Sequence, residues 1–298
     1  MKKFLTEVND GMVPVNLWKR EEVGTTDAAS KDLNTLMGAK VFDFPKPVDL
    51  IEPMIQIAAP EKDVIILDFF SGSATTAQAV MQLNAEDGGN RRFIMVQLPE
   101  PTDEKDEAFK SGYKNICEIG KERIRRAGEK IKSELKAKET GQQSFNDNGS
   151  AVNADSLDIG FKVFKLDSSN LKKWQPDYDN LEQSLFNSIG NYVDGRSELD
   201  VVYEIIIKMG LDLTYPIDEK LIGGKKVYSV GFGALMMCLD DAITTEVARG
   251  MVELYKANKP ETRKVVFKDN GFASDSVKTN VKEIFKCAGL EEDAFTTV

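Results

Sequence analysis

Apolar and polar positions along the chain follow patterns that predict both helices and strands. In residues 49–59, apolar side chains recur at spacings of three and four, which is typical of a helix with one buried face. Residues 64–67 are purely apolar and mostly β-branched, so they predict a strand covered on both faces, as in a parallel sheet. A helical pattern at 77–81 leads to a second such strand at 93–96. Strand, helix and strand in this order predict a right-handed βαβ unit of a doubly wound α/β fold.

Further elements follow on both sides of this unit. Residues 31–36 predict a short helix, and residues 41–47 are expected to be extended because each proline disfavours the helical region for its predecessor. An apolar stripe over 113–135 predicts a long helix. Between 121 and 139 its other face carries eight basic and four acidic residues. Such a face is typical of a solvated surface with ion pairs one turn apart, and a phosphate-facing surface is the alternative.

A change in composition divides the chain into two predicted domains. Residues 141–155 are rich in Gly, Ser, Asn and Gln and nearly lack large apolar side chains, which predicts a linker between domains 1–140 and 156–298. The second domain is expected to be mixed α/β, with strands at 161–166, 226–238 and 264–267 and helices at 199–209 and 277–288.

Composition and charge exclude several kinds of site. The chain has 298 residues, a net charge of −10 and no histidine. Without an imidazole, the Ser-His-Asp and Cys-His mechanisms and His-bearing zinc or iron sites are excluded, and no metal site is predicted. The negative charge disfavours non-specific binding of nucleic acid by the whole surface.

Cysteine spacing and hydropathy indicate the compartment. The three cysteines lie far apart without CxxC spacing, which argues against a disulfide framework and favours a reducing environment. No signal-peptide core and no apolar stretch of about 18 residues is present, so we expect neither secretion nor membrane insertion. The expected location is the cytoplasm.

The turn between the two predicted strands carries the strongest local signal for a ligand. In DFFSGSATT, residues 68–76, a glycine permits close approach of the backbone, and the N–H groups that open the next helix suit a carboxylate or phosphate. The turn lacks both the GxGxxG pattern of dinucleotide sites and the GKS or GKT of P-loops. Taken alone, these residues leave a ligand loop and a plain connection as alternatives.

Four motifs in order resemble those of a known family. The turn DFFSGSATT resembles the S-adenosylmethionine-binding motif of DNA amino-methyltransferases. The sequence FDFPKP at 42–47 resembles the companion motif that precedes it in the β-class order, and FIMVQLPE at 93–100 resembles the second cofactor strand. Together with IGKERIRRAG at 119–128, they look like the modification subunit of type III restriction–modification systems. The resemblance extends through LDIGFKVFKLDSSN at 157–170 to the end of the chain.

The resemblance implies an S-adenosyl-L-methionine-dependent enzyme that methylates the N6 amine of adenine in double-stranded DNA. It implies a partial Rossmann-like methyltransferase sheet with a C-terminal mixed α/β domain. In this family Asp68 positions the methionine end of the cofactor, Gly72 allows close approach and Gln97 binds the ribose. The implied cofactor-binding residues are Lys46, Pro47, Asp68, Phe69, Phe70, Ser71, Gly72, Ser73, Thr75, Thr76 and Gln97.

The chain departs from the family pattern at two points. Ala74 stands where the family usually has a second glycine. If this position needs a positive φ, the cost is on the order of 1 kcal/mol. The chain also lacks the catalytic tetrapeptide, an Asp or Asn followed by Pro-Pro and an aromatic residue. Its nearest counterpart, Gln175-Pro176-Asp177-Tyr178, fails in order and spacing.

No catalytic residue is therefore assigned. The chain is expected to be the C-terminal part of a modification subunit, inactive alone, that meets DNA mainly through the missing N-terminal region. Expected partners are a second modification subunit and a restriction helicase–nuclease subunit. The alternative is a non-catalytic module in which the C-terminal domain mediates dimerisation or docking. A nucleotide-dependent oxidoreductase is a third reading, disfavoured by Gln97 and by the absent GxGxxG.

Overall fold

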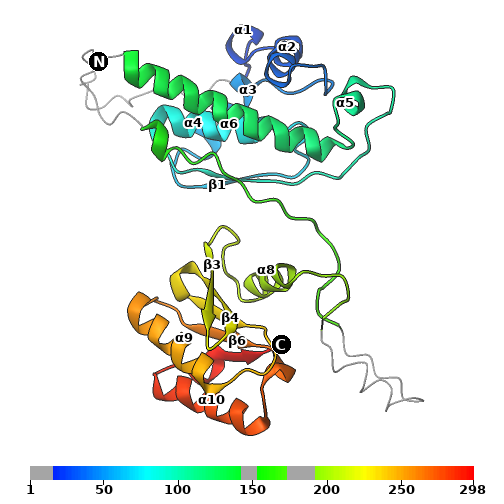
Figure 1. Cartoon of the computed structure of the whole chain (residues 1–298). Coiled ribbons are helices and arrows are strands. Elements are labelled where there is room, and N and C mark those ends of the chain that lie inside the picture. The colour runs from blue at the N-terminus through cyan, green and yellow to red at the C-terminus, as the bar shows by residue number, and fades with distance from the viewer. Residues whose placement is uncertain (1–15, 142–152, 173–191) are drawn as a thin grey trace, which may run out of the picture. The chain divides into compact units, whose positions relative to one another are not determined.

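The chain forms two compact units in the computed structural model, which describes residues 16–141, 153–172 and 192–298 (Figure 1). The units are Met1–Phe161 and Lys162–Val298. Each contains helices and strands, so the mixed α/β class predicted from the sequence is confirmed. Within the described residues, no helix has the length and apolar character needed to cross a bilayer. The tetrapeptide Gln175-Pro176-Asp177-Tyr178, the nearest counterpart of the catalytic motif, lies outside the described residues.

The boundary between the units lies after Phe161, beyond the expected start of the second domain at residue 156. A short 3₁₀ helix, η2 (Ala154–Ser156), begins the segment that follows the expected linker. Leu157 is buried, and Ile159 and Phe161 pack against the same apolar cluster of the first unit. Burial of these side chains attaches residues 154–161 to the first unit, which composition alone did not reveal.

The first unit is built around a pair of parallel strands. Strand β1 (Ile65–Asp68) pairs with β2 (Arg92–Met95), with Ile65 opposite Arg92 and Asp68 opposite Met95. Helix α4 (Thr75–Asp87) connects them, as the predicted strand–helix–strand order requires. In the described part of this unit the sheet has only these two strands. A larger Rossmann-like sheet stays a prediction.

One face of the ribbon formed by β1 and β2 is covered by helices. Ile66 and Phe93 point to α3 (Val48–Ala58) and α4, where they meet a small apolar cluster. Further out, α6 (Ile116–Gly141) packs on α4. In Figure 1 the helices of this unit lie on one side of the ribbon. The expected burial of the strands on both faces is therefore wrong for the described residues, and Ile65, Leu67 and Ile94 are exposed.

Three further helices complete the first unit. They are α1 (Arg20–Val23), α2 (Thr26–Met37) and α5 (Glu107–Lys110). Helix α2 is a full turn longer than the predicted helix at 31–36. The Thr25 hydroxyl caps it by accepting a hydrogen bond from the N–H of Ala28 at 3.2 Å, and Gly38 ends it in a left-handed conformation. The cap, and not apolar spacing, determines its first turn.

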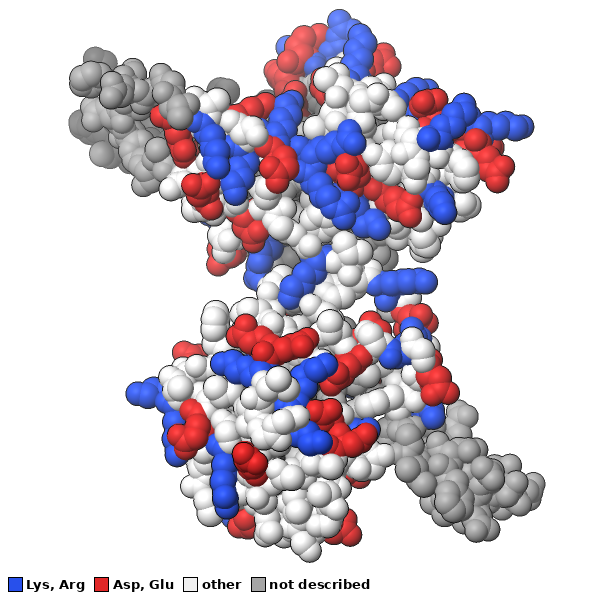
Figure 2. All heavy atoms as spheres, viewed as in Figure 1, with Lys and Arg blue, Asp and Glu red and all other residues white. Residues whose placement is uncertain are grey.

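The charged face of α6 is mostly a solvated surface, as expected. Glu122 pairs with Arg126 at 2.7 Å and Lys130 pairs with Glu134 at 3.8 Å, each one turn apart. Figure 2 shows basic and acidic side chains interspersed over the face of the first unit that carries α6. Opposite charges at these spacings neutralise one another locally. Arg123 is the exception, because its side chain is buried.

A five-stranded sheet forms the centre of the second unit. Its strands are β3 (Ile217–Ile222), β4 (Lys225–Val230), β5 (Leu235–Cys238), β6 (Lys264–Phe267) and β7 (Phe295–Thr297). They lie in sequence order, antiparallel from β3 to β5 and parallel from β5 to β7. Short 3₁₀ helices occur at η3 (Gly231–Gly233), η4 (Asp269–Gly271) and η5 (Glu292–Ala294).

Helices cover both faces of this sheet. Helix α8 (Glu198–Lys208) packs on one face with Tyr228, Met237 and Val266. Helices α9 (Thr245–Asn258) and α10 (Asp275–Cys287) pack on the other. The elements predicted at 199–209, 226–238, 264–267 and 277–288 are thus confirmed. The strand predicted at 161–166 is wrong, because these residues have no strand partner in the described structure.

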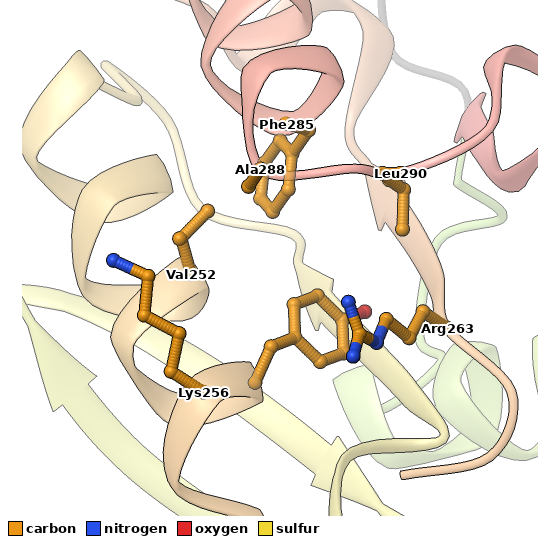
Figure 3. Close-up of a pocket in the computed structure, with 7 residues that line it drawn as sticks. Val252, Lys256, Arg263, Phe285, Ala288 and Leu290 are labelled. Carbon is orange, nitrogen blue, oxygen red and sulfur yellow. The ribbon is translucent and has the colours of Figure 1, made fainter. Parts of the chain in front are cut away.

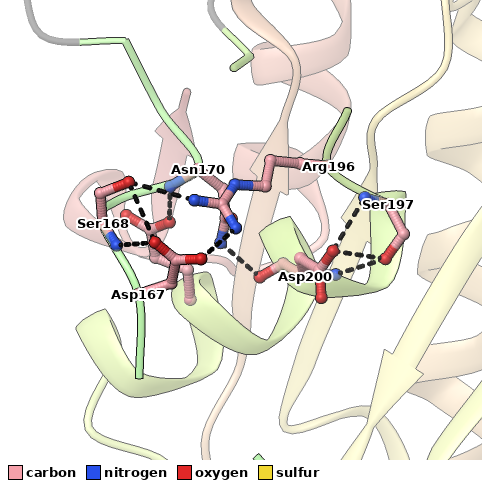
Figure 4. Close-up of polar contacts among 7 residues, drawn as sticks. Asp167, Ser168, Asn170, Arg196, Ser197 and Asp200 are labelled. Atoms are coloured by element: carbon pink, nitrogen blue, oxygen red, sulfur yellow. Dashed lines mark hydrogen bonds and ion pairs between the residues drawn. The ribbon is translucent and has the colours of Figure 1, made fainter. Parts of the chain in front are cut away.

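A polar network anchors the segment that enters the second unit onto α8 (Figure 4). Arg196 donates to Asp167 at 2.9 Å and to Ser168 Oγ at 3.1 Å, and it holds the pKa of the Asp167 carboxyl well below its usual range. The N–H of Asn170 donates to Glu204 of α8 at 2.6 Å. The motif at 157–170 therefore spans the boundary, with its apolar half on one unit and its polar half on the other.

A partly buried carboxyl makes the stability of the first unit depend on pH. Glu52 on α3 is partly buried, and its Oε1 has no hydrogen-bond partner. Desolvation, then the nearby Glu86 and Asp49, raise its pKa from 4.5 to about 7. The folded state therefore holds this proton more tightly than the unfolded state. Its contribution to stability is fully present below pH 4.5 and is lost as pH rises through about 7.

We expect Glu52→Gln to raise the free energy of unfolding by about 1 kcal/mol near pH 8, after allowance for solvent screening at this partly exposed site. The gain should shrink as the pH falls toward 4.5, where the native carboxyl is protonated as well. Urea unfolding at several pH values measures it, with Glu61→Gln at an exposed position as the control. An equal effect of Glu52→Gln at all pH values would contradict this account.

Candidate cofactor-binding turn

The turn between β1 and α4 is attached to the end of β2. Asp68 is the last residue of β1, and its carbonyl accepts a hydrogen bond from the N–H of Val96 at 2.9 Å. The N–H of Ser71 donates to the carbonyl of Val96 at 3.1 Å. These bonds continue the parallel pairing past the strands. They bring both predicted cofactor segments to the carboxyl edge of the ribbon, where ligands bind in open α/β sheets.

Asp68 and Thr76 are joined directly. The Thr76 hydroxyl donates to Asp68 Oδ2 at 2.6 Å, which connects the end of β1 to the first turn of α4. Asp68 is partly exposed, whereas Thr76 is buried. The second carboxylate oxygen of Asp68 accepts no hydrogen bond within the described residues, so this acid can still accept one from a ligand.

Gly72 has a left-handed conformation that favours glycine, and it leaves little space for a side chain. Its φ is +51°, and a Cβ placed there would lie 3.2 Å from the ring of Phe42. A side chain would therefore be strained and would also press on the FDFPKP segment. The absence of a side chain lets the companion motif pack against the turn.

Gln97 fixes the turn through its side chain. Its Oε1 accepts a hydrogen bond from the N–H of Gly72 at 2.8 Å, and its Nε2 donates weakly to the carbonyl of Leu98 at 3.3 Å. The amide oxygen is therefore engaged within the chain, while the amide nitrogen is the part left for a ligand. A contact between Gln97 and the ribose stays a prediction.

The Lys46-Pro47 pair lies beside the start of α4. The Thr75 hydroxyl donates to the carbonyl of Lys46 at 3.3 Å. The Lys46 side chain is exposed, and Pro47 is the residue that precedes α3. Two motifs some 30 residues apart in the sequence thus meet.

Ala74 adopts the left-handed conformation that its family position suggested. Its φ and ψ are 62° and 41°, and its side chain is buried with 2% exposure. Position 74 thus has the positive φ on which the predicted cost depends. A residue with a Cβ is strained there by an amount on the order of 1 kcal/mol. Burial of that methyl against α6 offsets a similar amount.

Arg123 supports the turn from behind, and sequence reasoning missed it. The side chain comes from α6 and is 3% exposed. Its guanidinium donates to Ser73 Oγ at 2.8 Å, Thr75 Oγ1 at 2.7 Å and Gln78 Oε1 at 3.0 Å. Position 123 lies one turn from Ile119 and from Ala127, which are both buried in the apolar stripe. This spacing was the sequence signal that Arg123 faces the interior.

The buried guanidinium has no carboxylate in contact within the described residues. Desolvation lowers the pKa of Arg123 to about 10, and only the more distant charge of Asp32 opposes this shift. Arg123 remains charged at neutral pH. A positive charge directly behind the first turn of α4 reinforces the positive end of the helix dipole.

These features leave polar and apolar groups at the turn for a ligand. Helix α4 begins without a side-chain cap, so its first N–H groups are left for a ligand or water. Together with the charge of Arg123, they suit a carboxylate. Phe69 and Phe70 are 61% and 73% exposed and meet edge to face, which leaves apolar rings at the same edge. Ser71 and Ser73 follow the two rings in the turn that leads to α4.

A cavity in the second unit does not serve this purpose. It is lined by Tyr255, Lys256, Arg263 and Phe285, with Val252, Ala288 and Leu290 (Figure 3). Its volume of about 40 Å³ is sufficient for water and far too small for a nucleoside. It belongs to the other unit and contains none of the predicted site residues.

Comparison with known proteins agrees with the motifs. Residues 3–145 match the family model described as DNA methylase. The chain is 38% identical over 156 residues to the type III StyLTI Mod subunit of Salmonella typhimurium, a stretch that covers 52% of this chain and 21% of the relative. It is 44% identical over 111 residues to the EcoPI Mod subunit of Escherichia phage P1, covering 37% and 17%.

A longer match is found with the EcoP15I Mod subunit of Escherichia coli, 30% identical over 242 residues, or 78% of this chain and 32% of the relative. The chain thus spans about a third or less of the length of these relatives. Residues 3–145, a little under half of the chain, match the DNA methylase family, and the chain is similar to parts of the modification subunits of type III restriction–modification enzymes.

Proposed function

We propose that the first unit binds S-adenosyl-L-methionine as the cofactor-binding portion of a site-specific DNA adenine-N6 methyltransferase. One observation carries the proposal. The turn after β1 meets the Lys46-Pro47 segment and Gln97 at an uncapped helix start, with Asp68 beside it. The three motifs that resemble the family's cofactor-binding motifs thus contact one another, which supports the proposal.

Different groups of the turn bind different parts of the cofactor. When bound, S-adenosylmethionine supplies an electrophilic methyl group. The free carboxylate oxygen of Asp68 accepts a hydrogen bond from its amino group. The N–H groups that open α4, backed by Arg123, receive its carboxylate. Gly72 lets the Phe42 ring pack against the turn that makes both contacts.

Methyl transfer itself requires groups that this chain does not contain. The sequence has no Pro-Pro-aromatic tetrapeptide to bind and stack a flipped adenine. We therefore propose that the chain is inactive alone and becomes active with a polypeptide that supplies base binding and target recognition. Double-stranded DNA, a second modification subunit and a restriction helicase–nuclease subunit are its proposed partners, in the cytoplasm.

Calorimetric titration with S-adenosylmethionine tests the proposal. We expect measurable binding by the unmodified chain and a loss of roughly tenfold to a hundredfold in affinity for Asp68→Ala, which removes a charge-assisted hydrogen bond. Asp63→Ala, on an exposed residue before β1, is the matched control and should bind normally. Absence of heat and of a thermal shift at millimolar cofactor would remove the cofactor assignment.

A second candidate function is a non-catalytic module for dimerisation or docking. The observation that favours it is that the second unit has apolar cores of its own on both faces of its sheet within the described residues, as a separately folding module would. Light scattering on the full chain, alone and with the restriction subunit of the Salmonella system, tests this function. A monomer that binds no restriction subunit would exclude it.

A further inference from the structure

Residues 154–161 run along helix α6 in the direction opposite to it (Figure 1). At one end, Asp155 forms an ion pair with Lys136 at 2.9 Å. At the other end, the ring of Phe161 lies below the guanidinium of Arg125, with 5.5 Å between the guanidinium carbon and the ring centroid. The contacts thus fall at earlier positions of α6 as the segment advances. We call residues 154–161 the strap.

The apolar side chains of the strap pack against two helices at once. Leu157 is 7% exposed, and it belongs to one apolar cluster with Ala77 and Met81 of α4 and with Ile124 and Ala127 of α6. The strap therefore adds to the packing that holds α4 and α6 together.

A glycine of α6 makes room for the strap. A Cβ placed at Gly128 would lie 2.9 Å from Cβ of Ile159 and 3.4 Å from Sδ of Met81. The first distance is too short for two carbon atoms, so any side chain at this position would displace the strap. Glycine inside a helix is less stable than alanine, and α6 therefore gives up some stability of its own to let the strap approach.

The other contacts of the strap are weak enough to break while the unit stays folded. The side chains of Lys136 and Asp155 are 53% and 75% exposed, so their ion pair is screened by water. The N–H of Ala154 donates to the Glu139 carboxylate at 2.8 Å. Among the described residues the strap has no strand partner. A segment held mainly by side chains opens locally at a low free energy.

The helices that the strap joins also carry the candidate cofactor turn. Arg123 is the residue before Ile124 on α6, and it donates to the hydroxyls of Ser73 and Thr75 at the start of α4. The strap and this guanidinium thus connect the same two helices. When the strap leaves, the packing between α4 and α6 is reduced and the bonds of Arg123 have to hold the turn with less support.

We propose that the strap is a latch for the cofactor turn. Seated on α6, it keeps α4 against Arg123 and the turn in its binding form; released, it lets the turn loosen and the cofactor affinity fall. The statement about affinity rests on the proposed function, and the statement about the turn does not. The strap continues into the segment that Asn170 anchors to Glu204 of α8, so an event that moves this anchor reaches the turn through the strap.

Hydrogen exchange of the full chain, followed by mass spectrometry, tests the latch. Gly128→Ala places a Cβ against Ile159 and should displace the strap while it favours the helical form of α6. Leu157→Asp should release the strap by a different route, because it places a charge in an apolar cluster and leaves α6 unchanged. Ser133→Ala, at an exposed position of α6, is the matched control for helix propensity.

Both test variants should increase exchange of the strap amides at least about tenfold and exchange of residues 69–80 about threefold or more, whereas Ser133→Ala should change neither. Exchange of β4, β5 and β6 in the second unit should stay as in the unmodified chain, which shows that the effect is local. Faster exchange of the strap without faster exchange of residues 69–80 would overturn the proposal. A strap that both variants leave fully protected would overturn it as well.

Titration with S-adenosylmethionine separates the latch from the proposed function. Both test variants should bind the cofactor about fivefold to twentyfold more weakly than the unmodified chain. Because such coupling is reciprocal, saturating cofactor should slow exchange of the strap in the unmodified chain. Equal affinity in all four chains would overturn the latch and leave the proposed function standing. An unmodified chain that never binds the cofactor would refute the proposed function, and exchange of residues 69–80 would still decide whether the strap holds the turn.

Discussion

Replacement of Arg123 by methionine is expected to lower the free energy of unfolding of the first unit by roughly 2–4 kcal/mol and to abolish measurable cofactor binding. Methionine preserves most of the apolar stem but donates no hydrogen bond. Ser73, Thr75 and Gln78 then lose the buried donor that now joins them. Relief from burying a charge offsets part of the cost, which keeps the expected loss below the sum of the bonds.

A second buried arginine, in the loop between α4 and β2, provides the control. Arg91 is 5% exposed and donates to both carboxylate oxygens of Asp87, at the far end of α4 from the turn. Arg91→Met should therefore destabilise the unit comparably but leave cofactor affinity unchanged. Arg123→Lys, which keeps the charge but cannot span the same acceptors, should recover part of the affinity.

Urea unfolding and calorimetric titration on the three variants measure these effects separately. Arg123 is a positioning residue only if affinity falls further for Arg123→Met than for Arg91→Met at matched stability. Cofactor affinity of Arg123→Met equal to that of the unmodified chain would contradict the role assigned to the guanidinium.

Phe267→Ala is expected to destabilise the second unit by about 3–5 kcal/mol while the first unit keeps its stability and its ligand binding. Phe267 on β6 is fully buried. Its ring lies 5.5 Å from Phe272, 5.8 Å from Phe285 and 5.5 Å from Phe295, measured between centroids. Truncation leaves a cavity among three rings that strands and helices hold in place.

The effect should remain in one unit because no described apolar core cluster contains residues from both. Scanning calorimetry should show one transition lowered and the other unchanged. Phe232→Ala is the control, since that ring is 70% exposed in the same unit. A single transition that shifts as a whole would mean that the two units unfold together.

Apolar spacing predicted most of the elements but not what stabilises their ends. The strands at 64–67 and 93–96 and the helices of the second unit were predicted because their side chains repeat with the period of the element. The first turn of α2 was missed, because a hydroxyl cap from Thr25 determines it and leaves no periodic trace. The packing of residues 154–161 on the first unit was not predicted. Leu157, Ile159 and Phe161 make these contacts, but they follow directly after the polar segment at 141–155.

The candidate site shows the same division. Its motif residues were predicted by their order along the chain, and the structure brings Asp68, Gly72 and Gln97 together. Arg123 was assigned to a solvated face because arginine is rarely buried, although its helical position placed it in the apolar stripe. The strands were predicted to be buried on both faces, and the exposed side chains of Ile65, Leu67 and Ile94 contradict this. An apolar run predicts that a strand is buried but does not say which element covers each of its faces.

Helix α6 also gives the turn a mechanical property. Over its 26 residues it is a rod about 39 Å long. Two of its side chains form hydrogen bonds with different parts of the site. Arg123 donates to the hydroxyls of Ser73 and Thr75, and the Cys117 thiol donates to the carbonyl of Gln97 at 3.3 Å. One stiff element thus supports both the helix start and the strand end. A tilt of the rod would carry the two walls of the turn together, so the spacing between them would survive the movement.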